Sequence, residues 1–238
     1  MPAADLVAWA LETYGERFAI AVSFQKEGMA IVDMASRVSR GVRVFTLETG
    51  RLPEETLRMM ETVRARYGIV VEPVRPDPME LGQMVAQHGV DLFRDSVDLR
   101  HLCCDIRKVR PLERKLKELE AWATGLRREQ SPDRAAVPKV ERQDGRIKIN
   151  PLADWTAEQV DEYTRRHDVP VHPLYAQGFA SIGCEPCTRA LRSGETGREG
   201  RWWWERDALK ECGIHFTPEG AVRRPGIVAD DVLADTDA

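Results

Sequence analysis

The stretch RFAIAVSFQKEG, residues 17–28, is an apolar run that passes directly into a short polar loop and the start of a helical pattern. Its first part, residues 17–24, predicts a buried strand, because it is continuously apolar and contains β-branched residues. The segment KEGMAIVDMASRV, residues 26–38, repeats its apolar positions with a period near 3.6 and predicts a helix. A strand that leads directly into a helix is the first half of a βαβ unit.

The same alternation extends outward from this unit in both directions. Strands are expected at residues 42–48, 69–74, 120–126 and 146–152, and helices at 4–14, 52–68, 77–89, 106–119 (bent at Pro111) and 154–167 (capped by Thr156). Strands alternating with helices predict an α/β fold with three layers, a parallel-type sheet with helices on both faces. Ligands of such sheets bind outside the carboxyl ends of the strands.

The alternation ends near residue 176, after which Gly, Arg and Cys become frequent. We therefore expect an α/β domain at residues 1–190, a C-terminal catalytic segment at residues 191–216 and an acidic tail at residues 217–238. The last 13 residues carry four Asp and no basic residue, which accounts for the whole formal charge of −4. Such a composition predicts that the tail is disordered by itself.

Composition restricts the class of protein. The chain of 238 residues is 42% hydrophobic and 31% charged, and it has no apolar run of the roughly 18 residues that a membrane helix needs. The N-terminus is acidic where a signal peptide is basic, so we expect a cytoplasmic protein. Residues 98–146 hold 13 Lys or Arg against 9 Asp or Glu. This local excess of positive charge suits the binding of a small anion. It is too slight for the broad basic face that a nucleic-acid-binding protein needs.

The cysteines form an unusual set. Cys103 and Cys104 are adjacent, and Cys184 and Cys187 form a Cys-x-x-Cys motif. Neighbouring cysteines cannot normally pair with each other, because their Cα atoms are held about 3.8 Å apart. In a cytosolic protein these four thiols indicate a 4Fe–4S cluster, a zinc site or redox chemistry, and we favour the cluster. Structural thiols are a further interpretation.

Two predicted loops lie where strands end. In the first, Ser23 and Gln25 offer side-chain donors, and its backbone amides open a helix, which suits phosphate. The loop matches the PP-loop consensus of ATP pyrophosphatases only in part, through Ser23 and Glu27. The second loop begins with Glu48 and Thr49, either of which could contact a ribose or a base.

The fifth cysteine has a different setting. Cys212 lies in a polar segment between Lys210 and His215. A nearby cation lowers the pKa of a thiol and so favours the nucleophilic thiolate at neutral pH. Upstream, Arg198 and Arg201 have a spacing that allows them to grip one anion. A surface cysteine beside a solvated charged turn is the alternative interpretation.

These motifs together resemble a known family. CCDIRK, IGCEPCTR, REGRWWW and KECGIH, in this order, are similar to the motifs of the cluster-containing adenylyl-sulfate (APS) branch of the assimilatory sulfonucleotide reductases. ATGLRREQSPDR, residues 123–134, and KINPLADWT, residues 148–156, are similar to segments between those motifs. The resemblance covers about residues 17–216 and implies a fold like that of the PP-loop, adenine nucleotide α-hydrolase proteins.

The resemblance also implies a reaction. Cys212 would attack the sulfur of adenylyl sulfate, release AMP and become S-sulfonated. Thioredoxin or glutaredoxin, supplied by another protein, would then release sulfite by thiol exchange. The implied site residues are Cys103, Cys104, Cys184 and Cys187 for one 4Fe–4S cluster, Lys108 and His215 beside Cys212 in catalysis, and Arg198, Arg201, Arg127 and Arg128 for the substrate.

Three alternatives are carried forward. The substrate could be the 3′-phosphorylated nucleotide, 3′-phosphoadenylyl sulfate (PAPS), because the cluster usually but not always accompanies the unphosphorylated one. A PP-loop iron–sulfur enzyme that thiolates tRNA would need an intact pyrophosphatase loop and a basic face, whereas SFQKEG departs from both the PP-loop and the common family loop. A non-catalytic zinc module would leave Cys212 without a role. The oligomeric state is left open.

Overall fold

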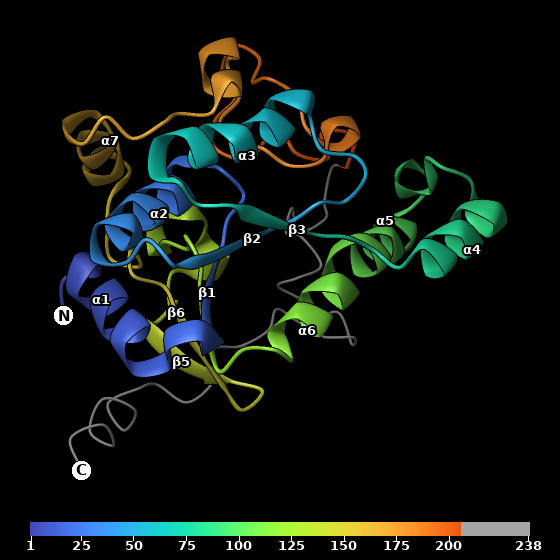
Figure 1. Cartoon of the computed structure of the whole chain (residues 1–238). Helices are drawn as coiled ribbons and strands as arrows, with labels where there is room; N and C mark the ends of the chain where they lie inside the picture. Colours follow the sequence, from blue (N-terminus) through green and yellow to red (C-terminus); the bar gives the residue numbers. More distant parts are fainter. Residues whose placement is uncertain (206–238) are drawn as a thin grey trace.

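The structure is a computed structural model of the chain, and it describes residues 1–205. Its centre is a six-stranded sheet with the order β3-β2-β1-β4-β6-β5 (Figure 1). The strands are β1 Phe18–Ala21, β2 Arg43–Leu47, β3 Val71–Val74, β4 Ala121–Ala123, β5 Val140–Gln143 and β6 Arg146–Ile149. All neighbouring pairs are parallel except β5 and β6, which are antiparallel. The expected parallel-type sheet is confirmed.

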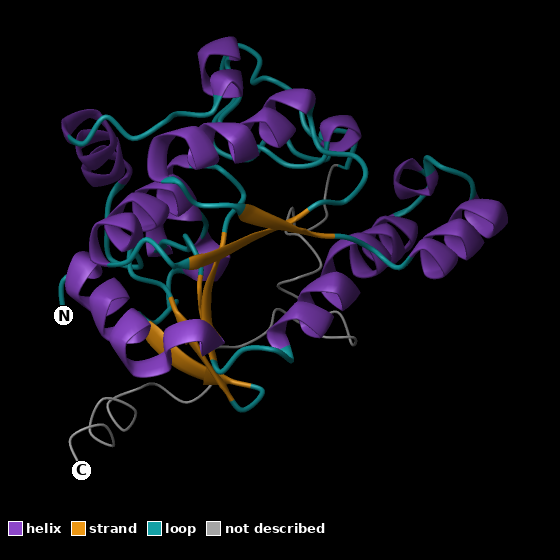
Figure 2. Cartoon of the chain, viewed as in Figure 1, coloured by secondary structure: helices purple, strands orange, loops and turns teal. Residues whose placement is uncertain are grey.

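Helices pack on both faces of this sheet (Figure 2). The helices are α1 Ala3–Tyr14, α2 Lys26–Val38, α3 Glu54–Tyr67, α4 Pro78–His88, α5 Val97–Cys104, α6 Arg110–Leu116 and α7 Ala157–Arg166. Helices α1, α2, α3 and α7 share the main core with Phe18, Ile20 and Val44, which lie on one face. The intervening residues Ala19 and Phe45 face the other way and pack with α6. The period-two alternation of side chains therefore divides the apolar strands between two cores.

Two elements of the structure were not predicted from the sequence. Strand β5 forms a hairpin with β6 through Asp144 and Gly145, both at positive φ (51° and 77°). Asp-Gly is a strong hairpin signal, but the flanking strands have only four residues each. Helix α5 is the second, and it begins at Ser96, whose hydroxyl accepts from the backbone N–H of Leu99 at 3.1 Å. This short capped helix carries the adjacent cysteines in its last turn.

The expected helix at residues 106–119 is also more complex than predicted. Helix α5 continues through a π-helical turn, Asp105–Val109, into α6, and Pro111 lies in the first turn of α6. Proline has no N–H to donate and its ring crowds the carbonyl four residues earlier, and the wider π-helical turn directly before it relieves this crowding. Lys108 lies within this wide turn.

Beyond α7 the described chain is mostly irregular, as expected from residue 176 onward. It contains two short 3-10 helices, Pro173–Gln177 and Glu185–Cys187, and an antiparallel bridge between Thr188 and Arg201. No helix among residues 1–205 is both long and apolar enough to cross a membrane. The proposed boundaries at residues 190 and 216 stay predictions.

Candidate active site

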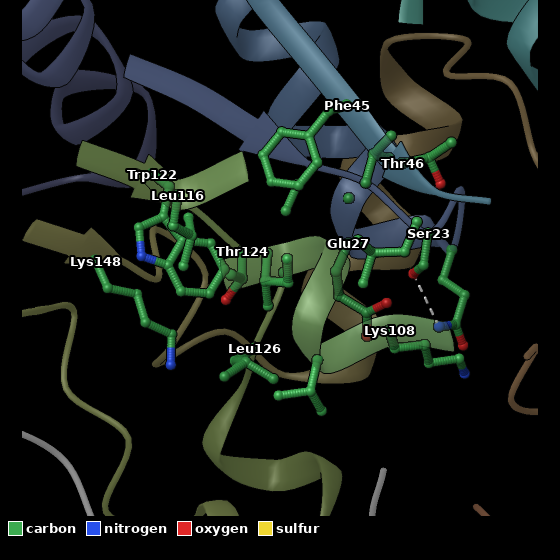
Figure 3. Close-up of a pocket in the computed structure, with 18 of the residues that line it drawn as sticks. Ser23, Glu27, Phe45, Thr46, Lys108, Leu116, Trp122, Thr124, Leu126 and Lys148 are labelled. Carbon is green, nitrogen blue, oxygen red and sulfur yellow. Dashed lines mark hydrogen bonds between the residues drawn. The ribbon is translucent and has the colours of Figure 1, made fainter. Parts of the chain in front are cut away.

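A pocket of about 830 Å³ opens at the carboxyl ends of β1, β2 and β4 (Figure 3). Ser23 from the first βα loop, Glu27 from the first turn of α2, Thr46 from β2 and Thr124 after β4 line it at this end. This is the position at which open α/β sheets bind ligands. Seven Lys or Arg and four Glu or Asp are among its lining residues, so the pocket favours an anionic ligand.

The first βα loop keeps the backbone form of a glycine-rich loop without its glycines. Phe24 has φ 56°, in the left-handed region that glycine prefers, and its ring is fully buried. Ser23 and Gln25 both line the pocket, as expected for nucleotide contacts. The Gln25 amide donates to Ser23 Oγ at 3.1 Å, and its oxygen accepts from the backbone N–H of Ile182 at 3.1 Å. Gln25 therefore also ties this loop to the segment that carries the Cys-x-x-Cys motif.

The four predicted ligand cysteines come together from two distant segments. Cys103 and Cys104 end helix α5, while Cys184 and Cys187 bracket the second 3-10 helix. All four are at most 8% exposed and belong to one apolar cluster with Trp202. They line a single cavity of about 20 Å³, which shares Lys108 and Arg201 with the lining of the main pocket. The tertiary fold thus joins the two motifs that are 80 residues apart in the chain.

The loop after β2, which contains Thr49 and Arg51, contacts the segments that carry the cysteines. Thr49 is fully buried, and its hydroxyl lies 3.3 Å from Cys184 Sγ. Arg107 donates through Nη1 to the carbonyl of Thr49 at 2.6 Å. The backbone N–H of Glu185 donates to the carbonyl of Arg51 at 2.8 Å. Thr49, predicted to face a ribose or base, is in this structure directed at a cysteine sulfur.

Burial favours the protonated form of two of these thiols, Cys103 and Cys187. Burial raises the pKa of Cys103, and the Arg107 guanidinium opposes that rise. Burial and the neighbouring Cys184 raise the pKa of Cys187 to about 11, while Lys108 and Arg201 act to lower it. A positive group bound beside Cys103 and Cys187 would favour their thiolate forms.

Two observations describe what this compartment can hold. Arg107 Nε, Arg201 Nε and Trp202 Nε1 are buried donors without hydrogen-bond partners among the described residues, and all three residues line the cavity. No group of three or more His, Cys, Asp or Glu within residues 1–205 converges on a point suited to one metal ion. Buried N–H donors around four cysteine sulfurs suit a bound group that is rich in hydrogen-bond acceptors.

Lys108 and Arg201 line both cavities, so they form the wall between the cysteine compartment and the main pocket. Arg201 is 5% exposed, and its guanidinium lies 4.5 Å from the centre of the Trp202 ring. Arg198 lines the main pocket at the same end. The structure therefore brings together three of the cations that the sequence predicted for the anion.

Other predicted substrate residues have different surroundings. Arg127 is 7% exposed and donates through Nε to Glu27 Oε1 at 2.9 Å, behind the pocket wall. Arg128 donates to the carbonyl of Val137 at 2.9 Å. Glu48 accepts from Gly50 N at 2.6 Å and from Arg75 Nε at 3.0 Å. None of Arg127, Arg128 and Glu48 is among the lining residues, and their substrate contacts stay predictions.

Cys212 and His215 lie outside the described residues. The described chain ends at Glu205, which accepts from Arg100 Nε at 2.6 Å in a buried ion pair. This pair connects the segment after the tryptophans to helix α5, the helix that carries Cys103 and Cys104.

Sequence reasoning missed the apolar half of the pocket. Five apolar residues line this half of the pocket: Phe45 and Leu47 from β2, Leu112 and Leu116 from α6, and Trp122 from β4. Their strands were recognised as buried, but the sequence does not show which face carries a pocket. The available signal was the period-two position of Phe45 and Leu47, which places both on the face opposite Val44.

Fold and site together define an α/β protein with a pocket of about 830 Å³, lined by more cations than anions, beside a compartment of four thiols. The chain belongs to the phosphoadenosine phosphosulfate reductase domain family, whose model matches residues 17–190. The resemblance expected from the cysteine and arginine motifs is thereby confirmed.

Relatives and solved structures agree with this membership. An adenosine 5′-phosphosulfate reductase from Burkholderia cepacia is 52% identical over 184 residues, 76% of this chain and 74% of that protein. One from Allochromatium vinosum is 46% identical over 215 residues, 88% and 84% of the two chains. The phosphoadenylyl-sulfate reductase of Candida auris has a TM-score of 0.67 at 28% identity and covers 78% of this chain and 89% of its own. Yeast FAD synthetase, at 15% identity and a TM-score of 0.53 with 79% and 66% coverage, shares the fold alone.

Proposed function

We propose that this chain reduces adenylyl sulfate to sulfite and AMP in sulfate assimilation, with Cys212 as the nucleophile. The observation that carries the proposal is the shared wall: Lys108 and Arg201 face an anion-binding pocket on one side and four buried cysteines on the other. The names of the curated relatives support adenylyl sulfate as the substrate. The Candida auris structure makes its 3′-phosphorylated form the second candidate.

Cys103, Cys104, Cys184 and Cys187 would hold one 4Fe–4S cluster. The buried donors of Arg107 and Trp202 that lack partners among the described residues support this assignment, because sulfide and thiolate sulfurs are acceptors. When bound, the cluster supplies fixed charge beside the cationic wall and holds the two cysteine segments together. Free thiols at such a site require a reducing compartment, which supports a cytoplasmic location.

The chemistry follows from charge. A Cys212 thiolate must approach a sulfuryl group that is itself anionic, so cations have to offset the repulsion. Lys108, Arg198 and Arg201 are placed to do so at one end of the pocket. The Cys212 sulfur forms a bond to the sulfur of the substrate, and the bond from that sulfur to the phosphate oxygen breaks. AMP leaves with the electron pair, and Cys212 carries the sulfonate.

The second half of the reaction requires a dithiol. One thiolate of a thioredoxin or glutaredoxin attacks the Cys212 sulfur, and sulfite leaves as a mixed disulfide forms. The second thiol of the dithiol then releases Cys212 as a thiolate. The two electrons that convert sulfate to sulfite come from the external dithiol, which ends as a disulfide.

The test is a comparison of two cysteine variants. Cys212→Ser should retain iron, acid-labile sulfide and the visible absorbance of anaerobically purified protein, and it should lose sulfite release. Cys187→Ser should lose the absorbance and the local fold. Sulfite release by Cys212→Ser at a near-normal rate would refute the nucleophile assignment, and colourless wild-type protein without iron would refute the cluster.

A further inference from the structure

The Gln25 side chain joins the first βα loop to the segment that leads into the Cys-x-x-Cys motif. Its oxygen Oε1 accepts from the backbone N–H of Ile182 at 3.1 Å. Its nitrogen Nε2 donates to Ser23 Oγ at 3.1 Å, the dashed line at Ser23 in Figure 3. Ser23, Gln25 and Ile182 all line the main pocket. One side chain therefore holds together two loops that are 157 residues apart in the chain.

This side chain is not used to cap its own helix. Gln25 occupies the N-cap position of α2 and makes no side-chain capping hydrogen bond. The residues preferred at an N-cap are Ser, Thr, Asp and Asn, whose short side chains fold back onto the first turn of the helix. Gln has one methylene more than Asn, and here its amide extends to Ile182. The long-range contact therefore takes the place of a helix cap.

The direction of these hydrogen bonds determines what the Ser23 hydroxyl can do. The Ile182 N–H can only donate, so the Gln25 oxygen must face it and the Gln25 nitrogen must face Ser23. Ser23 Oγ thus already accepts a hydrogen bond, and no residue within the described part of the chain accepts the Ser23 proton. Ser23 is exposed and lines the main pocket. Its hydroxyl is therefore available as a donor to an acceptor atom of a bound ligand.

The other end of this chain of hydrogen bonds lies at Arg201. Both neighbours of Ile182 meet the Arg201 guanidinium: Ser181 Oγ lies 3.5 Å from Nη1, and a Cβ on Gly183 would lie 2.5 Å from Nη2. Ile182 itself is 4% exposed, and Cys184 follows Gly183 directly. Fixing the Ile182 backbone therefore fixes the groups against which the guanidinium packs and the start of the Cys-x-x-Cys motif.

We propose that Gln25 is a positioning residue: it couples binding of the nucleotide at Ser23 to the position of the Ile182 backbone. Through the neighbours of Ile182 the coupling extends to Arg201. An acceptor atom that takes the Ser23 proton strengthens the two hydrogen bonds of Gln25, because hydrogen bonds aligned in one direction polarise one another. The identity of the ligand, a nucleotide, rests on the proposed function.

Residue-resolved hydrogen exchange of the full-length, anaerobically purified protein measures this coupling. In wild type, AMP should slow exchange of the Ile182 amide at least about fivefold, which corresponds to about 1 kcal/mol. Gln25→Asn should abolish the slowing without unfolding the protein, since Asn is a preferred N-cap for α2 but is too short to reach Ile182.

Gln159→Asn is the matched control for this experiment. Gln159 Oε1 also accepts from a backbone N–H, that of Thr156 at 2.8 Å, and Gln159 does not line the main pocket. The control variant should show the wild-type slowing. Equal slowing of Ile182 exchange in Gln25→Asn and Gln159→Asn would overturn the proposal, because AMP would then act on Ile182 without Gln25.

A double-mutant cycle on the affinity for AMP provides a second test. Ser23→Ala and Gln25→Asn should each raise the dissociation constant about fivefold. The double variant should also be about fivefold weaker, because both changes interrupt one chain of hydrogen bonds. A double variant weakened about 25-fold, the product of independent effects, would overturn the proposal.

The same titrations separate failure of this inference from failure of the proposed function. Wild-type protein that does not bind AMP would overturn the proposed function and the role of Gln25 together. Wild-type binding that Gln25→Asn leaves unchanged would overturn the role of Gln25 alone.

Discussion

The guanidinium of Arg201 lies directly against the Cα of Gly183, so that a Cβ at position 183 would be 2.5 Å from Arg201 Nη2. Contacts of that length essentially never occur for real Cβ atoms, so any side chain at position 183 would displace the guanidinium. Gly183 immediately precedes Cys184. The absence of one methyl group therefore allows the cation to reach the wall between the cysteines and the substrate pocket.

Gly183→Ala should weaken binding of adenylyl sulfate about tenfold, or 1.4 kcal/mol, because Arg201 would move from the wall. The visible absorbance should persist, since the four cysteines are retained. Equilibrium binding to the Cys212→Ser background, which cannot turn over, gives the dissociation constant. Gly82→Ala in α4 is the matched control, because a Cβ there has nothing within 4 Å. Equal affinity for Gly183→Ala and Gly82→Ala would contradict the role of this contact.

Lys108→Ala should slow the S-sulfonation of Cys212 by about 2–4 kcal/mol, the scale of a lost charge-stabilising donor. Lys108 lines both cavities, so its charge acts where the thiolate and the sulfuryl group meet. Rapid-quench single-turnover measurement with adenylyl sulfate gives the rate, and iron analysis checks that the cluster is kept. Lys139→Ala removes an ion pair with Asp154, neither residue of which lines the pocket, and it is the control. A rate for Lys108→Ala close to that of Lys139→Ala would remove Lys108 from the catalytic assignment.

Adenylyl sulfate should be preferred over its 3′-phosphorylated form by at least about 1.4 kcal/mol in kcat/KM, one factor of ten. The expectation rests on the four-cysteine compartment and on the names of two similar curated relatives, both adenosine 5′-phosphosulfate reductases. Initial rates with both nucleotides, at equal concentrations of one reductant, measure the ratio. Parity or the reverse preference would show that this chain resembles the Candida auris enzyme in substrate as well as in fold.

Residues 198–216 should become protected when the site is filled. The anion would give Arg198 and Arg201 a common partner and draw the Cys212 segment toward the substrate sulfur, a closure of the kind that active-site lids perform. Hydrogen exchange with and without adenylyl sulfate, using the Cys212→Ser protein, measures the change. Arg201→Ala should reduce the protection from hydrogen exchange when the same fraction of the protein has adenylyl sulfate bound. Unchanged exchange with both adenylyl sulfate and AMP would refute closure and leave the nucleophile assignment untouched.

Stability should fall on the acid side of neutrality because of His172. His172 is 1% exposed, its Nδ1 accepts from Leu174 N at 3.3 Å and its Nε2 lies 2.9 Å from Thr56 Oγ1. Burial lowers the pKa of His172, with Glu55 opposing, so the folded state binds this proton less readily than the unfolded state. Its contribution to stability is therefore present above about pH 6.5 and is lost as the pH falls through the lower folded-state pKa.

Urea unfolding at pH 7 and pH 5 measures this dependence. His172→Gln should be less stable than wild type at pH 7 but should lose less stability on acidification. His88→Gln, at an exposed position near the end of α4, should leave the pH dependence unchanged. A pH dependence of His172→Gln equal to that of wild type would mean that His172 does not set the acid limit.

The sequence by itself determined the layers of this protein and the inventory of its site. Apolar runs such as residues 18–21 and the helical period of residues 26–38 follow from local steric and hydrophobic patterning, which acts over a few neighbouring residues. The motifs named the four clustered cysteines, Lys108 and the arginine couple as residues of one site. Local patterning fails where apolar residues are few: β5, with the sequence VERQ, has one apolar residue in four, which is why it was missed.

Only the tertiary structure decided how that inventory is arranged. It placed Cys103 and Cys104 in one cavity with Cys184 and Cys187, and Lys108 and Arg201 in the wall between two cavities. It also paired Arg127 with Glu27. Which cation faces the pocket depends on contacts between residues far apart in the chain, such as Arg201 against Gly183. Spacing along the chain carries no information about such contacts, because they depend on how each side chain is packed by elements that come together only on folding.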